Sequence, residues 1–220
     1  NIKTFEYFPN YVKNNSNMMI MADTSASMCN NDRIPIASAI GLGIYFAEKN
    51  TGVFHNKFMT FSSQPNFIDL DGAKTLSDKI RKIPYIVSNT NLEAAFDLIL
   101  KVAKENKLKN DDLPKALVVI SDMEFDEANR ENGYTQRRDF SKLMTDKYKN
   151  AGYTLPAIIY WNVSARQNTF HAEANAKGIE MVSGQATQIF KYITENKIET
   201  PYELMIKVLN SKRYAAIKIA

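Results

Sequence analysis

The chain contains one cysteine, Cys29, and two histidines among its 220 residues. A single cysteine excludes an internal disulfide and favours a reducing compartment, so we expect a cytoplasmic protein. No apolar run approaches the roughly 20 residues that cross a bilayer, and the first residues show no signal-peptide pattern. The sequence therefore argues against a disulfide scaffold and against a membrane protein.

The chain also lacks an internal repeat, a coiled-coil pattern and a glycine-rich phosphate loop. Its closely spaced glycines, Gly41 and Gly43, fall inside a helical pattern, where we expect close helix packing rather than dinucleotide binding. The net charge of +4 permits an anionic partner without indicating nucleic-acid binding. Because the chain starts with Asn1 instead of Met, we expect a fragment or a processed product.

The composition, with 45% hydrophobic and 24% charged residues, is typical of a soluble globular protein. A chain of this length favours one core with some elaboration over two full domains. We expect residues 1–17 to form an N-terminal extension and residues 18–220 to form one domain that ends in helices.

Short apolar runs alternate with segments whose apolar residues recur every three or four positions. The runs predict strands at 18–22, 57–61, 67–70, 116–120, 156–161 and 179–182. The periodic segments predict helices at 34–49, 76–83, 92–104, 140–149, 187–194 and 201–210. This alternation predicts an α/β fold, a doubly wound and mostly parallel sheet with helices on both faces. The second and third strands could form a hairpin or a ribbon.

Three polar clusters follow strands or precede a helix: 23–27, 88–91 and 121–122. Open α/β sheets bind their ligands at the carboxyl ends of strands, so these clusters mark a candidate site. Every second residue of the first cluster, Asp23, Ser25 and Ser27, carries a side-chain oxygen. Such ligands suit Mg²⁺, or another hard cation such as Mn²⁺ or Ca²⁺. The two histidines lie outside the clusters, which argues against a zinc site.

The segment Asp23–Ser27 resembles the DxSxS motif of the metal-ion-dependent adhesion site of von Willebrand factor A-type (vWA) domains. Thr90 resembles the threonine of the second loop of that site, and Asp122 resembles the aspartate of its third loop. The resemblance implies a Rossmann-like fold over about residues 18–182. It also implies that Ser25, Ser27 and Thr90 bind the cation directly or nearly so, while Asp23 and Asp122 act through water and hydrogen bonds.

Within the vWA superfamily, the chain most resembles an uncharacterised family of phages, bacteria and plants that is similar to the C-terminal domain of the Ro (TROVE) RNA-binding proteins. The resemblance is carried by residues 121–126, 160–163 and 201–205. The sequence departs from the commoner vWA pattern after Asp122, where Met123 and Glu124 replace a frequent glycine. Glu124 and Asp126 could bind a further water, although charged residues in such a loop usually face solvent.

A DxSxS pentapeptide and Thr90 could also serve merely as loop and helix-capping residues, but three clusters in the right order favour a metal site. We expect a binding module rather than an enzyme, and we expect its Mg²⁺ to capture a carboxylate of a protein partner. Ser25 is not expected to act as a nucleophile, because neither His55 nor His171 lies at an expected strand end where it could serve as the base. One alternative is an RNA-associated Ro-like module that uses the lysines of residues 101–109. The other is a metal-dependent phosphodiester hydrolase that uses Glu124 and Asp126.

Overall fold

The computed structural model describes residues 17–84, 91–122, 133–164 and 179–184, together with residues 206 and 210. The strands within these ranges are β1 (Met18–Ala22), β2 (Lys57–Thr60), β3 (Phe67–Asp69), β4 (Ala116–Ser121), β5 (Ala157–Asn162) and β6 (Ile179–Ser183). They form one sheet in the order β3-β2-β1-β4-β5-β6. All neighbouring strands are parallel except the β2–β3 hairpin, as the sequence predicts.

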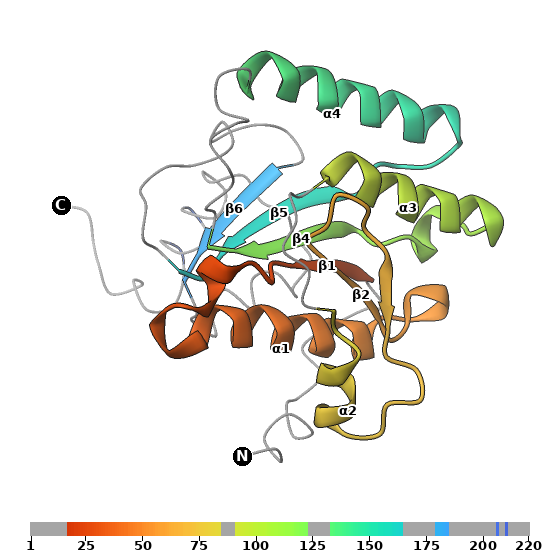
Figure 1. The fold of residues 1–220 in the computed structure, drawn as a ribbon. Helices are drawn as coiled ribbons and strands as arrows, with labels where there is room; N and C mark the ends of the chain where they lie inside the picture. Colours follow the sequence, from red (N-terminus) through yellow and green to blue (C-terminus); the bar gives the residue numbers. More distant parts are fainter. Residues whose placement is uncertain are drawn as a thin grey trace.

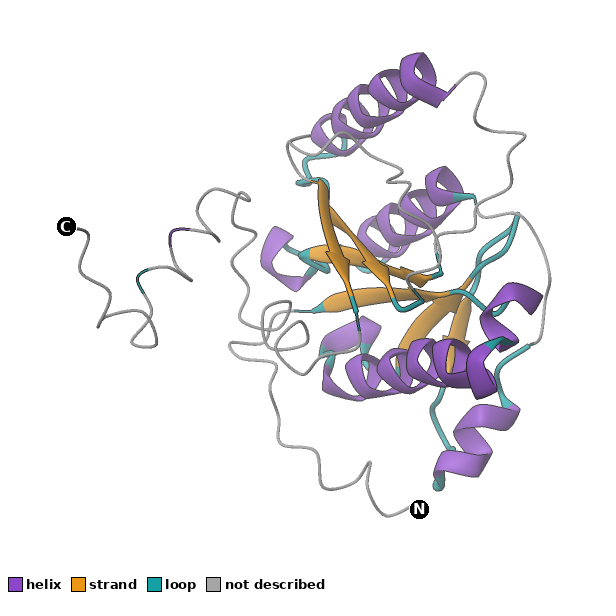
Figure 2. Ribbon diagram, turned by 90° about the vertical axis from the view of Figure 1, so that its left-hand side faces the viewer, coloured by secondary structure: helices purple, strands orange, loops and turns teal. Residues whose placement is uncertain are grey.

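Helices cover both faces of this sheet. They are α1 (Ile34–Lys49), α2 (Leu76–Arg81), α3 (Leu92–Glu105) and α4 (Gly133–Asn150). Figure 1 shows α1 and α2 on one face and α3 and α4 on the other, and the turned view in Figure 2 agrees. The α/β class and the doubly wound arrangement are therefore confirmed.

The two central strands, β1 and β4, are buried along their whole length. They pair in parallel from Met18 opposite Ala116 to Ala22 opposite Ile120. Strands covered by helices on both faces need apolar side chains at every position, which explains their unbroken apolar runs. Each buried Val, Leu, Ile or Met side chain contributes about 1.5–3 kcal/mol, so this pair forms the centre of the core.

Close packing on one face depends on a glycine of α1. A Cβ atom at Gly43 would lie 2.8 Å from the Phe58 ring of β2, well inside contact distance. The absent side chain therefore lets α1 rest directly on the sheet, and the predicted packing role of this glycine is confirmed.

Some helix ends and caps differ from the sequence prediction. The helix predicted at 76–83 ends at Arg81. The helix predicted at 140–149 begins earlier, at Gly133, because polar Gln and Arg residues extend a helix well without adding apolar periodicity. The N-cap of α3 is Asn91, whose side chain accepts a hydrogen bond from the backbone of Ala94, so Thr90 does not hold the capping position. The helix predicted at 187–194 lies outside the described residues. Of the helix predicted at 201–210, only Ile206 and Asn210 are described, and the amide of Asn210 donates a 2.9 Å hydrogen bond to the carbonyl of Ile206. No helix in the described ranges is long and apolar enough to cross a membrane.

The strand order also fixes where a ligand would bind. From β1 the chain continues to β2 and β3 on one side, whereas from β4 it continues to β5 and β6 on the other side. The connections that leave these two neighbouring strands therefore diverge, and open α/β sheets bind their ligands at the carboxyl ends of such strands. Both the loop after β1 and the end of β4 carry polar clusters that the sequence singles out.

Candidate metal centre

The loop after β1 is joined to the end of β4 by the backbone. The amide of Asp23 donates a 2.9 Å hydrogen bond to the carbonyl of Ile120. This bond continues the parallel register of the two strands by one step beyond Ala22 and Ile120. Asp23 and Ser121 are consequently neighbours, although 98 positions separate them in the sequence.

The carboxylate of Asp23 is held from two sides. Its Oδ2 atom accepts a 2.6 Å hydrogen bond from the buried hydroxyl of Ser121. Its Oδ1 atom accepts a 2.8 Å hydrogen bond from the backbone amide of Ser25. The second bond is an Asx turn, which bends the loop back over the end of the strand. The position of this carboxylate is thus set by both central strands.

The hydroxyls of Ser25 and Ser27 lie together beside this carboxylate. Their Oγ atoms are 3.0 Å apart, and both residues are partly exposed. A 3-10 turn, η2 (Ala26–Cys29), follows Ser25 and brings the two side chains to the same side of the loop, with Met28 anchored in the core. The loop therefore presents two adjacent hydroxyls on partly exposed residues.

Negative charge is buried beneath these hydroxyls. Asp23 and Asp122 are each only 3% exposed. Burial is the main reason that the pKa of Asp23 is raised; hydrogen bonds from Ser121 and Ser25 oppose the rise, and the negative charge of Asp122 adds to it. A cation placed between these groups would neutralise both carboxylates, which is the electrostatic condition that a metal site provides.

The donor set fits a hard divalent cation. Two carboxylates and two hydroxyls offer only oxygen atoms, which suits Mg²⁺, Mn²⁺ or Ca²⁺. Among the residues that the structure describes, no group of three or more His, Cys, Asp or Glu side chains could hold a metal ion. A metal at this edge would therefore depend on the serine hydroxyls, and the softer ligand sets of structural zinc sites are absent from the described part of the chain.

Four of the five predicted site residues belong to this cluster: Asp23, Ser25, Ser27 and Asp122. The fifth, Thr90, lies outside the described residues, as do Glu124 and Asp126. The next residue along, Asn91, donates its backbone amide to the carbonyl of Ser62 at 3.2 Å. Ser62 follows β2, so the start of α3 lies at the same carboxyl edge of the sheet as the cluster.

Sequence reasoning overlooked the part played by Ser121. The sequence pattern identifies this residue as polar but predicts no contact for it, because the apolar run before it indicates only a strand. The signal that could have identified it is a hydroxyl at the last position of a fully buried strand, directly before an acid. A buried hydroxyl there must find a hydrogen-bond partner, and the neighbouring strand offers Asp23.

Residues 17–216 match a family model described as a domain of unknown function, DUF7788. The chain belongs to this family. The chain is also similar to the uncharacterized protein L728 of Acanthamoeba polyphaga mimivirus, with 29% identity over 198 residues. That match covers 88% of this chain and 33% of the viral protein, so the chain spans about a third of its relative.

Solved structures with the fold of this DUF7788 domain include the Ro (RSR) protein of Deinococcus radiodurans. It is 17% identical with a TM-score of 0.57, and the match covers 86% of this chain and 35% of that one. The SpRpn10 VWA domain is 18% identical with a TM-score of 0.43, covering 83% of this chain and 95% of that one. The mussel byssus protein PTMP1, in a structure described with a zinc-occupied MIDAS motif, is 14% identical with a TM-score of 0.40, covering 82% and 46%. The Ro likeness and the strand order confirm a vWA-like fold.

Proposed function

We propose that this DUF7788 domain is a divalent-cation-dependent protein-binding module. In this proposal Mg²⁺ is held by five residues: Asp23, Ser25, Ser27, Thr90 and Asp122. The observation that supports it most strongly is that the buried carboxylate of Asp23, close enough to buried Asp122 to feel its charge, is bonded to a loop in which the partly exposed Ser25 and Ser27 place their hydroxyls 3.0 Å apart. The metal would supply the positive charge that this cluster needs.

How deeply each site residue is buried determines which part of the site a partner could reach. Asp23 and Asp122 are buried, whereas Ser25 and Ser27 are partly exposed. An ion seated on the hydroxyls would face solvent on its outer side, because Mg²⁺ keeps several exchangeable water ligands. A carboxylate of a partner protein could replace one of these waters, and the surrounding loops would then supply specificity.

We propose a binding role rather than catalysis because the described part of the chain places no histidine beside Ser25, and the neighbouring carboxylate of Asp23 is assigned to the cation. The ring Nδ1 of His55 contacts the carbonyl of Asn50 at 2.8 Å. Asn50 is hydrogen-bonded to Met18 at the amino end of β1, whereas Ser25 follows the carboxyl end of that strand. A serine nucleophile needs a base within hydrogen-bond reach. His171 lies outside the described residues. The hydrolase alternative, which depends on Glu124 and Asp126, and the cytoplasmic location stay predictions.

The test uses Mn²⁺ as the cation, because its effect on water-proton relaxation reports the waters that remain on the bound ion. The chain with Mn²⁺ should show enhanced relaxation that acetate lowers, whereas chloride at the same ionic strength should leave it unchanged. Asp23→Ala should show no enhancement. Enhanced relaxation that acetate does not affect would contradict carboxylate capture while leaving metal binding intact.

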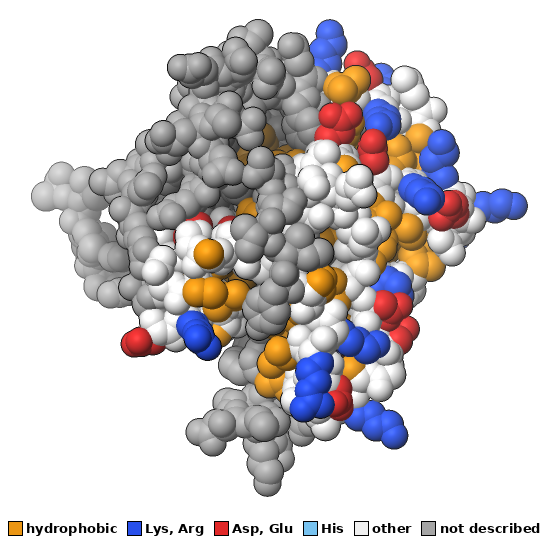
Figure 3. Space-filling view, viewed as in Figure 1, with side chains coloured by type: hydrophobic (Ala, Val, Ile, Leu, Met, Phe, Trp, Pro, Cys, Tyr) orange, Lys and Arg blue, Asp and Glu red, His pale blue; other side chains and the backbone are white. Residues whose placement is uncertain are grey.

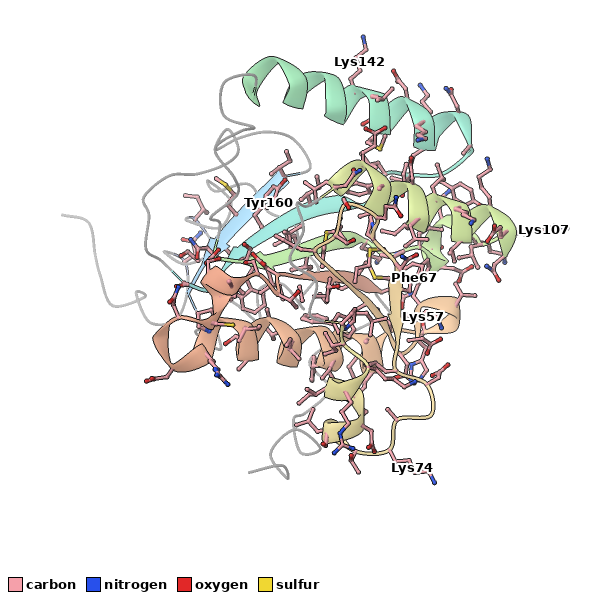
Figure 4. All side chains as sticks on the ribbon, viewed as in Figure 1. Lys57, Phe67, Lys74, Lys107, Lys142 and Tyr160 are labelled. Carbon is pink, nitrogen blue, oxygen red and sulfur yellow. The ribbon has the colours of Figure 1, made fainter. Side chains whose placement is uncertain are left out.

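The RNA-associated alternative receives less support from the surface. On the α3 and α4 face, Lys101 lies 3.9 Å from Glu105, and Lys147 is paired with Asp97. Figure 3 shows acidic side chains among the Lys and Arg side chains there, and Figure 4 places Lys107 at the end of α3 far from the loop after β1. Binding through phosphates would weaken steeply with added salt, so a salt titration of RNA binding distinguishes the two functions.

A further inference from the structure

We infer that Ser121 is a positioning residue of the proposed metal site: its hydroxyl orients the Asp23 carboxylate for cation binding. This inference rests on the proposed function and extends it to a residue outside the five that the vWA resemblance supplies. It stands on the 2.6 Å bond from Ser121 Oγ to Asp23 Oδ2, on complete burial of Ser121 and on the register of the central strands.

The bond joins the two halves of the site. Asp23 belongs to the loop after β1, and Ser121 is the last residue of β4, directly before Asp122. With the Ser25 amide on Oδ1 and the Ser121 hydroxyl on Oδ2, neither carboxylate oxygen can rotate without losing a hydrogen bond. The Ser121 hydroxyl therefore sets the direction of the carboxylate on which the first metal loop is built.

The direction of the proton matters as much as the distance. A carboxylate at neutral pH only accepts hydrogen bonds, so the Ser121 hydroxyl must donate. Its proton points toward Asp23, and Asp23 in turn remains an acceptor for the loop that carries Ser25 and Ser27. Groups that orient metal ligands in this way typically contribute about 10- to 100-fold to metal affinity.

The test compares Mn²⁺ affinity, measured by calorimetry with the metal alone, in the full chain and in variants. Ser121→Ala should bind Mn²⁺ about 10- to 100-fold more weakly, and Ser121→Thr, which keeps the hydroxyl, should restore most of the affinity. Tyr148→Phe is the matched control. It removes one buried hydroxyl that donates to the Phe96 carbonyl at 2.7 Å, away from the site, and it should leave Mn²⁺ affinity unchanged.

The outcomes separate this inference from the function beneath it. Absence of Mn²⁺ binding by the unaltered chain overturns the metal site and this inference together. Normal binding by Ser121→Ala overturns only the role of Ser121, and equal losses in the Ala and Thr variants show that side-chain size, not the hydroxyl, matters. If Ser121→Ala does not fold, Ser121→Cys takes its place, because a thiol fills similar space but donates weakly.

Discussion

The sheet buries polar side chains in opposite ways at its amino edge, where the parallel strands begin, and at its carboxyl edge, where they end. At the amino edge, Asn50 bonds both the amide and the carbonyl of Met18 at 2.9 Å, and Asn17 bonds the Thr51 amide at 2.7 Å and the Asp112 carbonyl at 2.9 Å. At the carboxyl edge, Asp23 and Asp122 are both buried, and the charge of Asp122 helps to raise the pKa of Asp23. The buried asparagine side chains at the amino edge are neutral and hydrogen-bonded, whereas these two side chains at the carboxyl edge are acidic.

This contrast separates a structural edge from a functional one. A buried amide with matched partners stabilises the fold without any ligand. A buried carboxylate whose pKa is raised, as in Asp23, costs folding free energy until a counter-charge arrives. A pocket of about 300 Å³ lies at the amino edge, lined by Asn17, Thr51, Gly52, Val53, Leu108 and Asp112. The chemistry of the carboxyl edge is nevertheless the better guide to a cation site, because the Asn17 amide is already hydrogen-bonded.

The largest effect is expected from Asn50→Ala at the amino edge. The change leaves the amide and the carbonyl of Met18 buried without partners, which should lower the free energy of unfolding by about 3 kcal/mol. Urea denaturation checks the value. Asn66→Ala, at an exposed asparagine, is the control and should cost less than about 0.5 kcal/mol. Equal costs in the two variants would show that the amide network does not stabilise this edge.

Tyr148→Phe measures how much one buried hydroxyl contributes to the free energy of unfolding at a position away from both edges. Loss of its bond to the Phe96 carbonyl should cost about 1 kcal/mol, measured by urea denaturation near pH 7. A destabilisation that depends on Mg²⁺ would contradict the separation of this residue from the metal site.

The same residue gives a pH dependence. Burial, and then the charge of Asp97, raise the pKa of the Tyr148 hydroxyl. A pKa raised in the folded state contributes stability that is present below the unfolded pKa of about 10 and is lost as the pH rises above it. The free energy of unfolding, measured by urea denaturation at a series of pH values from neutral to 12, should therefore decrease more steeply with pH for the unaltered chain than for Tyr148→Phe. Parallel curves would show that Tyr148 does not titrate with unfolding.

The smallest effect on stability is expected from Asp122→Asn in the presence of EDTA. The variant removes one of two buried like charges, so the free energy of unfolding should change by less than about 1 kcal/mol. It should also lose any stabilisation by Mg²⁺. Melting curves in EDTA and in Mg²⁺ check both points. A loss in EDTA as large as that of Asn50→Ala would mean that the two edges do not differ.

Most of the fold could be predicted because its two central strands, β1 and β4, are buried on both faces. An unbroken apolar run such as 116–120 leaves few alternatives, and α1 begins and ends at the residues that periodicity predicts. The early start of α4 at Gly133 could not be predicted in this way, because a polar helical stretch has no apolar pattern to detect. Likewise, the sequence indicates Thr90 as a helix-capping residue, whereas in the structure the side chain of Asn91 caps α3 by accepting a hydrogen bond from the amide of Ala94.

The sequence predicts which residues form the candidate site but not which of them are hydrogen-bonded to one another. The alternation of Asp23, Ser25 and Ser27 marks the loop, and each strand end marks a cluster. The link between Asp23 and Ser121 depends on which strands are neighbours, and that order follows from packing of the whole sheet. Sequence spacing alone holds no information about a contact across 98 positions.

The thermal response to Mg²⁺ tests the central claim most directly, namely that the carboxyl edge binds a divalent cation. A ligand at one hundred times its dissociation constant stabilises the folded state by about 2.7 kcal/mol, which corresponds to roughly 5–10 °C for a chain of this size. The account predicts that saturating Mg²⁺ raises the melting temperature by this amount, that EDTA reverses the rise, and that Asp23→Ala abolishes it. Identical melting temperatures of the unaltered chain in Mg²⁺, Mn²⁺, Ca²⁺ and EDTA would contradict it.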